Sequence, residues 1–210
     1  MRKNKDICTA AFMTTDNSTL ASYIKKASRR IPDEDIPMLM QCAQERSVKK
    51  GEVLLKEGAV CREFYLIKKG YLRTWYNKEG VVINVNFAFE GDFTTNPHSI
   101  HNRAASEFNI EAGEDTDLWV FNLDDITSRF AREHSPQIVL FIRRLSIHIL
   151  LQSEEHSNFF KTHTPTERYR YIEEHNPQLL QRISLSQIAS YLGITRETLS
   201  RIRAKGNSKS

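Results

Sequence analysis

The distribution of hydrophobic and polar residues divides the chain into a β-rich part and a helical part. Over residues 48–121, short apolar runs rich in Val, Ile, Phe, Tyr and Trp alternate with glycines. Runs of about 4–8 residues separated by turn residues are typical of an antiparallel sandwich or barrel. The pattern therefore predicts a β domain. The glycines that mark its expected corners are Gly51, Gly58, Gly70, Gly80 and Gly91.

The segment before this domain has helical spacing. Apolar residues recur every three or four positions over residues 18–44, and Pro32 and Pro37 interrupt the pattern. Because proline removes a hydrogen bond from a helix interior, we expect short flanking helices that stop at these prolines. Residues 1–17 are expected to form a frayed extension, and they do not have the long apolar run of a secretory signal.

Residues 136–160 show a third pattern, in which apolar residues recur at alternating steps of four and three. This is the spacing of a heptad seam, and the flanks of the helix are apolar as well, so a second copy of the chain is its natural cover. The prediction is a parallel homodimer; the alternative is a long helix packed wholly on its own domain. The expected seam consists of Ile138, Ile142, Leu145, Ile149, Gln152 and His156.

Residues 162–165 break the seam and predict a hinge, after which residues 184–203 read as two short helices joined by a tight turn. Ser184 is a good N-cap for the first helix, with a glutamine three residues later. Gly193 can adopt the left-handed conformation that a sharp turn requires. Thr195 caps the second helix, whose Leu199 faces inward.

The outward face of the second helix carries polar side chains suited to reading DNA. An arginine can bond guanine O6 and N7 as a fork, and a glutamate can accept from cytosine N4, so this face suits a half-site with G·C pairs. A solvated face on an ordinary helical hairpin is the alternative, but the caps, turn and face in this order favour DNA. The expected base-contacting residues are Arg196, Glu197, Ser200 and Arg201.

Phosphate contacts are expected around the same two helices. The candidates are Ser184, Ser186, Thr195, Thr198, Arg203 and Lys205, with Arg182 and Lys209 as further cations. The charge distribution agrees: the net charge is +4, and residues 161–210 hold 9 Lys and Arg against 4 Asp and Glu, whereas residues 1–160 hold 21 against 22. A local excess of positive charge is what binding to phosphates requires.

The composition also bears on disulfides, membrane spans, metal sites and catalysis. Cys8, Cys42 and Cys61 are widely separated and odd in number, which indicates no disulfide framework and a reducing cytoplasm. No apolar run approaches the roughly 18 residues of a membrane span, so we expect no membrane association. His98 and His101 have no third ligand in clear spacing and predict no metal site. We expect no enzyme, since no phosphate loop, nucleophile–histidine pair or metal triad is present.

The run Ile-Ala-x-x-Leu-Gly-Ile-Thr-Arg-Glu-Thr-Leu-Ser-Arg over residues 188–201, together with the glycine-cornered β region and the long helix, resembles the Crp/Fnr superfamily of bacterial transcription regulators. The resemblance covers about residues 35–205. It implies an α+β fold: a cyclic-nucleotide-binding type antiparallel jelly roll, a long dimerisation helix and a helix-turn-helix of winged type. Seven residues follow Arg203, so the C-terminal wing is expected to be truncated. The expected divisions are residues 1–34, 35–125, 126–161 and 162–210.

The resemblance also implies partners and roles. It implies a homodimeric, cytoplasmic regulator that binds a palindromic site on double-stranded DNA and contacts RNA polymerase. Glu197 and Arg201 match base-contacting positions common to much of the family. Arg196 matches an extra arginine of the cyclic-AMP receptor branch, while Glu197, Ser200 and Arg201 match the reader of the Fnr branch, so the half-site is left open between the two branches.

The expected effector pocket departs from the cyclic-AMP pattern. Members that bind cyclic AMP have a Gly-Glu turn and then an arginine before the next strand. Here Asp92 follows the glycine, Ser106 stands at the position of the arginine, and Arg103 lies three residues off register. A phosphate would lack a charge-assisted bond, so cyclic AMP is not expected as the ligand. A longer loop that turns Arg103 inward toward another nucleotide or anion is an alternative.

No cofactor is predicted. An iron–sulfur cluster is not expected because Cys8 stands alone in its region, and no histidine is singled out as a haem ligand. A second functional class stays open beside the DNA-binding regulator, namely a ligand-sensing module whose helical pair docks on another protein.

Overall fold

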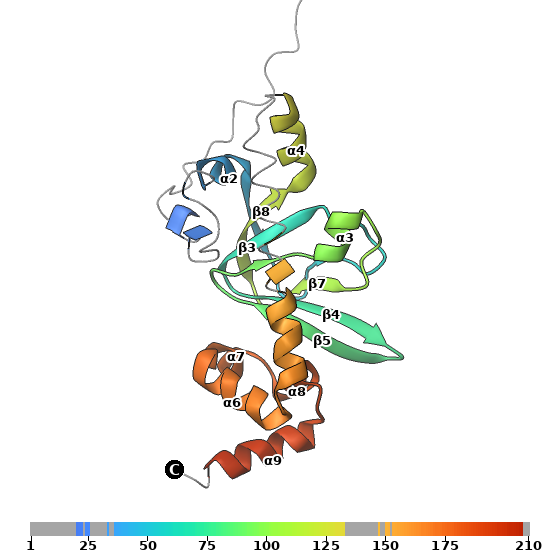
Figure 1. Cartoon of the computed structure of the whole chain (residues 1–210), viewed down its shortest axis with the longest axis vertical. Coiled ribbons are helices and arrows are strands. Elements are labelled where there is room, and N and C mark those ends of the chain that lie inside the picture. Colours follow the sequence, from blue (N-terminus) through green and yellow to red (C-terminus); the bar gives the residue numbers. More distant parts are fainter. Residues whose placement is uncertain are drawn as a thin grey trace, which may run out of the picture.

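The computed structural model describes residues 20–22, 24–25, 33, 36–132, 147, 150–151 and 153–207. A β sandwich occupies its middle, with α2 and α4 at one end and the C-terminal helices at the other (Figure 1). The predicted extension over residues 1–17 lies outside the described residues. So do five of the six predicted seam residues, which are Ile138, Ile142, Leu145, Ile149 and Gln152.

The sandwich consists of two four-stranded antiparallel sheets. One has the order β1-β8-β3-β6 and the other the order β2-β7-β4-β5. The first sheet is built from β1 (Ala43–Val48), β8 (Thr116–Asn122), β3 (Glu63–Lys69) and β6 (Phe93–Thr94). The second is built from β2 (Val53–Leu55), β7 (Asn109–Ala112), β4 (Leu72–Lys78) and β5 (Val81–Ala88). The predicted antiparallel β domain and the α+β fold class are therefore confirmed.

The N-terminal flank differs from its prediction. Helix α2 (Ile36–Cys42) contains Pro37 as its second residue, so this proline does not interrupt the helix. The first turn of a helix tolerates proline because its N–H would have no partner there. Strand β1 follows α2 at once and begins five residues before the predicted β region. Its polar sequence is held as an edge strand by antiparallel pairing with β8.

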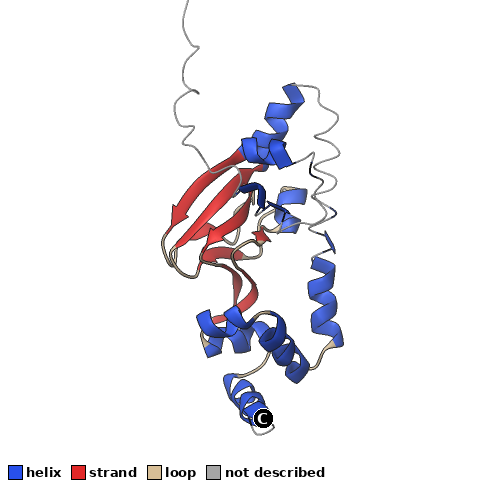
Figure 2. Ribbon diagram, turned by 90° about the vertical axis from the view of Figure 1, so that its left-hand side faces the viewer, coloured by secondary structure: helices blue, strands red, loops and turns tan. Residues whose placement is uncertain are grey.

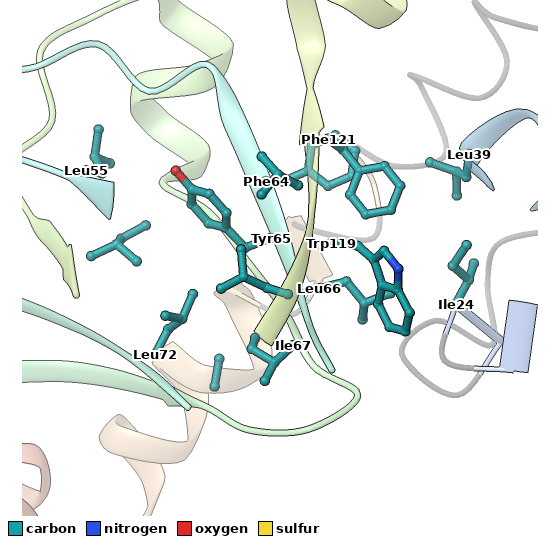
Figure 3. Packing of buried hydrophobic residues seen from close by; sticks show 14 of the residues in the cluster. Ile24, Leu39, Leu55, Phe64, Tyr65, Leu66, Ile67, Leu72, Trp119 and Phe121 are labelled. Atoms are coloured by element: carbon teal, nitrogen blue, oxygen red, sulfur yellow. The ribbon is translucent and has the colours of Figure 1, made fainter. Parts of the chain in front are cut away.

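The core lies against both faces of the central strands β3 and β8 (Figure 3). Phe64 and Phe121 stack with ring centroids 4.8 Å apart, and Trp119 is almost fully buried. Ile24 and Leu39 pack on the same core from the N-terminal flank. Burial on both faces explains why these two strands read as continuous apolar runs rather than as an alternating pattern.

The helices beyond the sandwich follow local signals. Helices α3 (Pro97–Asn102) and α4 (Leu123–Arg132) pack at the sandwich, and residues 153–162 form a helix, called here the connecting helix, that runs beside it (Figure 2). Thr164 caps the next helix through a capping box with Glu167. The helical structure is therefore interrupted at residues 163–164, within the predicted hinge segment.

The last four described helices form a compact unit, called here the head. They are α6 (Pro165–His175), α7 (Pro177–Arg182), α8 (Leu185–Leu192) and α9 (Arg196–Asn207). The head shares an apolar core with the sandwich, to which Tyr71, Phe87 and Phe89 contribute from the β side. The Ser190 hydroxyl accepts from the backbone N–H of Asn84 at 3.0 Å and donates to the carbonyl of Val82 at 3.1 Å. The head is thus docked on β5 and its neighbours.

Arg182, at the end of α7, fastens this junction. Its guanidinium donates to both carboxylate oxygens of Glu90, at 2.7 and 3.0 Å, and also to Glu114. It also lies 5.5 Å from the ring centroid of Tyr71 and 5.1 Å from that of Phe89, within the range of cation–π attraction. The sequence had suggested Arg182 as a phosphate contact, but in the structure its guanidinium is bonded to Glu90 and Glu114 at the junction.

Glu90 gives this junction a dependence on pH. Burial opposes its ionised form, but hydrogen bonds from Arg182 and from the N–H of Gly70 outweigh burial and hold the pKa of Glu90 below its ordinary value of 4.5. A carboxyl group with a lowered pKa stabilises the folded state above its ordinary pKa. That stabilisation is lost as the pH falls through the folded-state pKa.

Glu90→Gln should therefore lower the free energy of unfolding by about 1–3 kcal/mol at pH 7, because the Arg182 donors lose a charged acceptor. The difference from wild type should shrink as the pH falls below 4.5. Urea denaturation at several pH values measures both effects. Glu57→Gln, at an exposed glutamate, is the matched control and should stay within about 0.5 kcal/mol of wild type. A Glu90→Gln protein with wild-type stability at pH 7 would contradict the assigned role of the junction.

Candidate functional site

Helices α8 and α9 form a helix-turn-helix unit. Ser184 caps α8, accepting from the backbone N–H of Gln187 at 3.3 Å, and Ile188 and Leu192 are buried on the inner face. Gly193 has a φ of 70°, in the left-handed region, and ends α8. Any residue with a Cβ would be strained there, so glycine permits the tight turn into α9. The predicted helix pair and its turn are confirmed.

Arg168 of α6 holds this turn from within the chain. Its Nε donates to the carbonyl of His163 at 2.9 Å and its Nη1 to that of Leu192 at 3.0 Å. Its Nη2 donates to the carbonyl of Phe160 at 2.5 Å, and the guanidinium lies over the Phe160 ring. One side chain therefore ties the end of the connecting helix to the end of α8. We did not identify this residue from the sequence, where nothing but its helical position marks it.

The four predicted base-contacting side chains lie together on the exposed face of α9. Arg196, Glu197, Ser200 and Arg201 are all exposed, whereas Leu199 is buried beneath them. Helix α9 forms the end of the molecule farthest from α4 (Figure 1), so the sandwich does not cover this face. Hydrogen bonds from its own backbone N–H and from the Thr195 hydroxyl lower the pKa of Glu197, which keeps the carboxylate ionised.

Most of the predicted phosphate-contacting residues are exposed. Thr195 caps α9 by accepting from the N–H of Thr198 at 3.2 Å, and the Thr198 hydroxyl also accepts from Arg201 at 3.1 Å. Lys209 lies outside the described residues. Thr198 is half-buried, and the exposed members are Ser184, Ser186, Thr195, Arg203 and Lys205. Their contacts with DNA stay predictions.

His156 is the one predicted seam residue that the structure describes. It is half-buried and shares a hydrogen bond of 3.3 Å, through its Nε2, with the Tyr191 hydroxyl of α8. Burial lowers the pKa of His156. Its ring also lies 4.9 Å from that of Phe160 on the connecting helix and 5.9 Å from that of Tyr191. Ile147 and Leu150 on the preceding segment are apolar and 45% and 66% exposed.

The three predicted effector residues are not brought together. Asp92 is exposed and accepts from the N–H of Phe89 at 2.9 Å. Ser106 is buried, accepting from Asn96 at 2.7 Å and donating to the carbonyl of Phe108 at 2.6 Å. Arg103 forms an ion pair with Asp124 on the surface.

The direction of Arg103 has a structural cause. It ends α3 in the left-handed conformation, with a φ of 54°, and Asp124 at the start of α4 holds its guanidinium. Asp124 also pairs with Arg62 at 3.2 Å. The alternative in which Arg103 turns inward toward an anion is therefore not the arrangement that the structure shows.

Two cavities border the sandwich and the head. The smaller, of about 260 Å³, is lined by three cations, Lys50, Arg73 and Arg182. Arg73 pairs with Glu111 at 2.9 Å and Arg182 with Glu90 at 2.7 Å. The larger, of about 740 Å³, opens between β5, the connecting helix and the head, and Asp92 is on its lining. Among the described lining residues of the two cavities, Lys and Arg occur only in the smaller one.

The described residues hold no group of three or more His, Cys, Asp or Glu side chains suited to a metal ion. His98 and His101 lie exposed on α3. No helix in the described ranges has the length and apolar character needed to cross a bilayer.

Comparisons with known proteins agree with this architecture. The family model described as the cyclic nucleotide-binding domain matches residues 45–133. No curated protein matches the chain. The structure is similar to FixK2 from Bradyrhizobium japonicum, with a TM-score of 0.64, 21% identity, and coverage of 80% of this chain and 85% of that one.

Two further solved structures have the same arrangement. The c-di-GMP responsive global regulator CLP from Xanthomonas campestris has a TM-score of 0.63 and 14% identity, covering 84% of this chain and 92% of that one. A Crp/Fnr-family transcriptional regulator from Eubacterium rectale has a TM-score of 0.57 and 20% identity, covering 86% of each chain. Residues 45–133 thus match the cyclic nucleotide-binding domain, and the described chain has the fold of the Crp/Fnr transcription regulators.

Proposed function

We propose that this protein is a homodimeric, sequence-specific DNA-binding regulator of transcription. The observation that carries the proposal is the exposed Arg196, Glu197, Ser200 and Arg201 face at the outer end of a helix-turn-helix. These side chains begin at the N-terminus of α9, the end that such a helix presents to base edges. Its arginines would bond guanine, and the ionised Glu197 would accept from cytosine.

Dimerisation would place two such faces on one duplex. The exposed Ile147 and Leu150 are apolar side chains that a second copy could cover, in the segment where the sequence predicts a seam. A two-fold axis along that segment would set two α9 helices about 34 Å apart, one turn of DNA, and would require a palindromic site. Control of transcription would then proceed through contact with RNA polymerase.

The contacts of the head define how regulation would work. Arg182 and Ser190 attach the head to the sandwich, while Arg168 attaches it to the connecting helix. A ligand or partner that favours one set of contacts over the other would rotate the head about residues 163–164. Only a molecule with different affinity for the two arrangements can shift this equilibrium.

Arg201→Ala should weaken binding to the specific site by about 1–3 kcal/mol and relax selectivity at one base pair. Lys205→Ala is the matched comparison, since it should weaken binding to all sequences and reduce the salt dependence. Fluorescence anisotropy titrations with specific and scrambled duplexes at several salt concentrations separate the two effects. Specific binding that survives Arg201→Ala unchanged would show that α9 does not read the bases by this face.

Cyclic AMP should bind more weakly than about 10 μM, a binding free energy no stronger than about −7 kcal/mol. The reason is that Arg103 is paired with Asp124 and that buried Ser106 occupies the expected arginine position. Arg103→Ala should therefore leave the isothermal titration result unchanged. A dissociation constant below about 10 μM that Arg103→Ala abolishes would show that Arg103 turns inward after all.

A further inference from the structure

The larger cavity has the dimensions of a small-molecule site. Its volume of about 740 Å³ lies inside the range of about 300–1,000 Å³ that such sites occupy. The sandwich lines one side of it, mainly through β4, β5, β6 and the start of α3. The connecting helix and the head line the other side. An occupant would therefore touch both parts whose relative position the proposed function requires to change.

Two polar side chains on its sandwich wall lack partners. Thr74 of β4 and Asn86 of β5 lie opposite each other in the strand register, and both line the cavity. Within the described ranges, no hydrogen bond engages either side chain, although Thr74 is only 9% exposed. The polar atoms of Thr74 and Asn86 are not cut off from water, but Asn176 Oδ1 on the head side of the same lining is buried without a partner among the described residues. A buried polar atom without a partner is costly, so a ligand with a matching amide or hydroxyl group would gain binding energy in this cavity.

The charges around the cavity disfavour an anion. None of its described lining residues is a lysine or arginine, whereas Asp92 and Glu155 are carboxylates. His156 adds no positive charge at neutral pH, because burial lowers its pKa. A phosphate or sulfonate would lose its water without gaining a cation. The two carboxylates do not demand a cation either, since both are exposed and have other partners.

The rest of the lining is rich in aromatic rings. Phe93 and Phe108 come from the sandwich, Phe159 from the connecting helix, and Tyr171 and Tyr191 from the head. Burial raises the pKa of Tyr191 to about 12, so its phenol is neutral. Such a wall favours a flat apolar body that can stack on rings from both sides.

We propose that this cavity binds an uncharged aromatic molecule that carries an amide or hydroxyl group, and that this ligand bridges the sandwich and the head. The inference deepens the proposed function, because the bridging contact with Tyr171 and Tyr191 is what would bias the orientation of the head. The ligand class differs from a cyclic nucleotide in the one property that the lining determines most clearly, namely charge.

A pair of fluorescent probes tests the charge rule directly. N-phenylnaphthylamine is neutral, and anilinonaphthalene sulfonate has the same aromatic body with one negative charge. The full-length protein should bind the neutral probe at least about tenfold more tightly than the sulfonate, measured by fluorescence titration. Equal affinity, tighter binding of the sulfonate, or no binding of the neutral probe would overturn the proposal.

Substitutions in and outside the cavity test whether the probe binds there. Val85→Trp should fill part of it and weaken the neutral probe at least about tenfold, while Val81→Trp, on the same strand but 59% exposed and outside the cavity, should leave binding unchanged. Asn86→Arg supplies the missing cation and should reverse the preference toward the sulfonate. This reversal keeps the test decisive even if Val85→Trp does not fold. Unchanged selectivity in a folded Asn86→Arg protein would place the probe elsewhere.

DNA binding by the same proteins separates this inference from the proposed function. Probe selectivity without any specific DNA binding would contradict the proposed function and leave the ligand site supported. Specific DNA binding without probe selectivity would contradict the ligand site alone.

Discussion

One guanidinium determines how the two parts of this chain meet. Arg182 is bonded to Glu90 and Glu114 and lies over the rings of Tyr71 and Phe89, so it satisfies its charge and covers apolar surface at the same place. The shared core around it includes Phe87 of β5, Tyr71 and Phe89 beside the strands, and residues from all four helices of the head. A junction of this composition is specific but partly polar, and it can separate at lower cost than a fully apolar core.

The head has a second attachment, to the connecting helix. A head attached at two places is the arrangement that a change between two head positions requires. Arg168 donates to carbonyls at the ends of the connecting helix and of α8, so this one side chain attaches the helix-turn-helix piece to the connecting helix across residues 163–164. The contact of Ser190 with β5 and the ion pairs of Arg182 hold that piece against the sandwich. The large cavity lies between the same elements, so the ligand proposed for it would contact both the sandwich and the head.

Features that depend on neighbouring residues could be predicted from the sequence, whereas contacts between residues far apart in the chain could not. The caps at Ser184 and Thr195 and the turn at Gly193 lie within a few residues of what they control, so the helix pair and its exposed face could be predicted. The role of Arg182 could not, because Glu90 lies 92 residues away and only the folded chain brings them together. Arg103 likewise depends on a left-handed cap and on Asp124, 21 residues later. Strand β1 is polar and gains its structure from pairing with β8, which local propensity does not reveal.

The most direct test of the account is selection of binding sites from a pool of random duplex DNA by the full-length protein. An exposed reading face presented twice by a symmetric dimer predicts an enriched inverted repeat that contains G·C pairs, with half-site centres about 10 base pairs apart. Enrichment of no sequence, or of a site without inverted symmetry, would contradict the assignment of α9 as the reader of a palindrome.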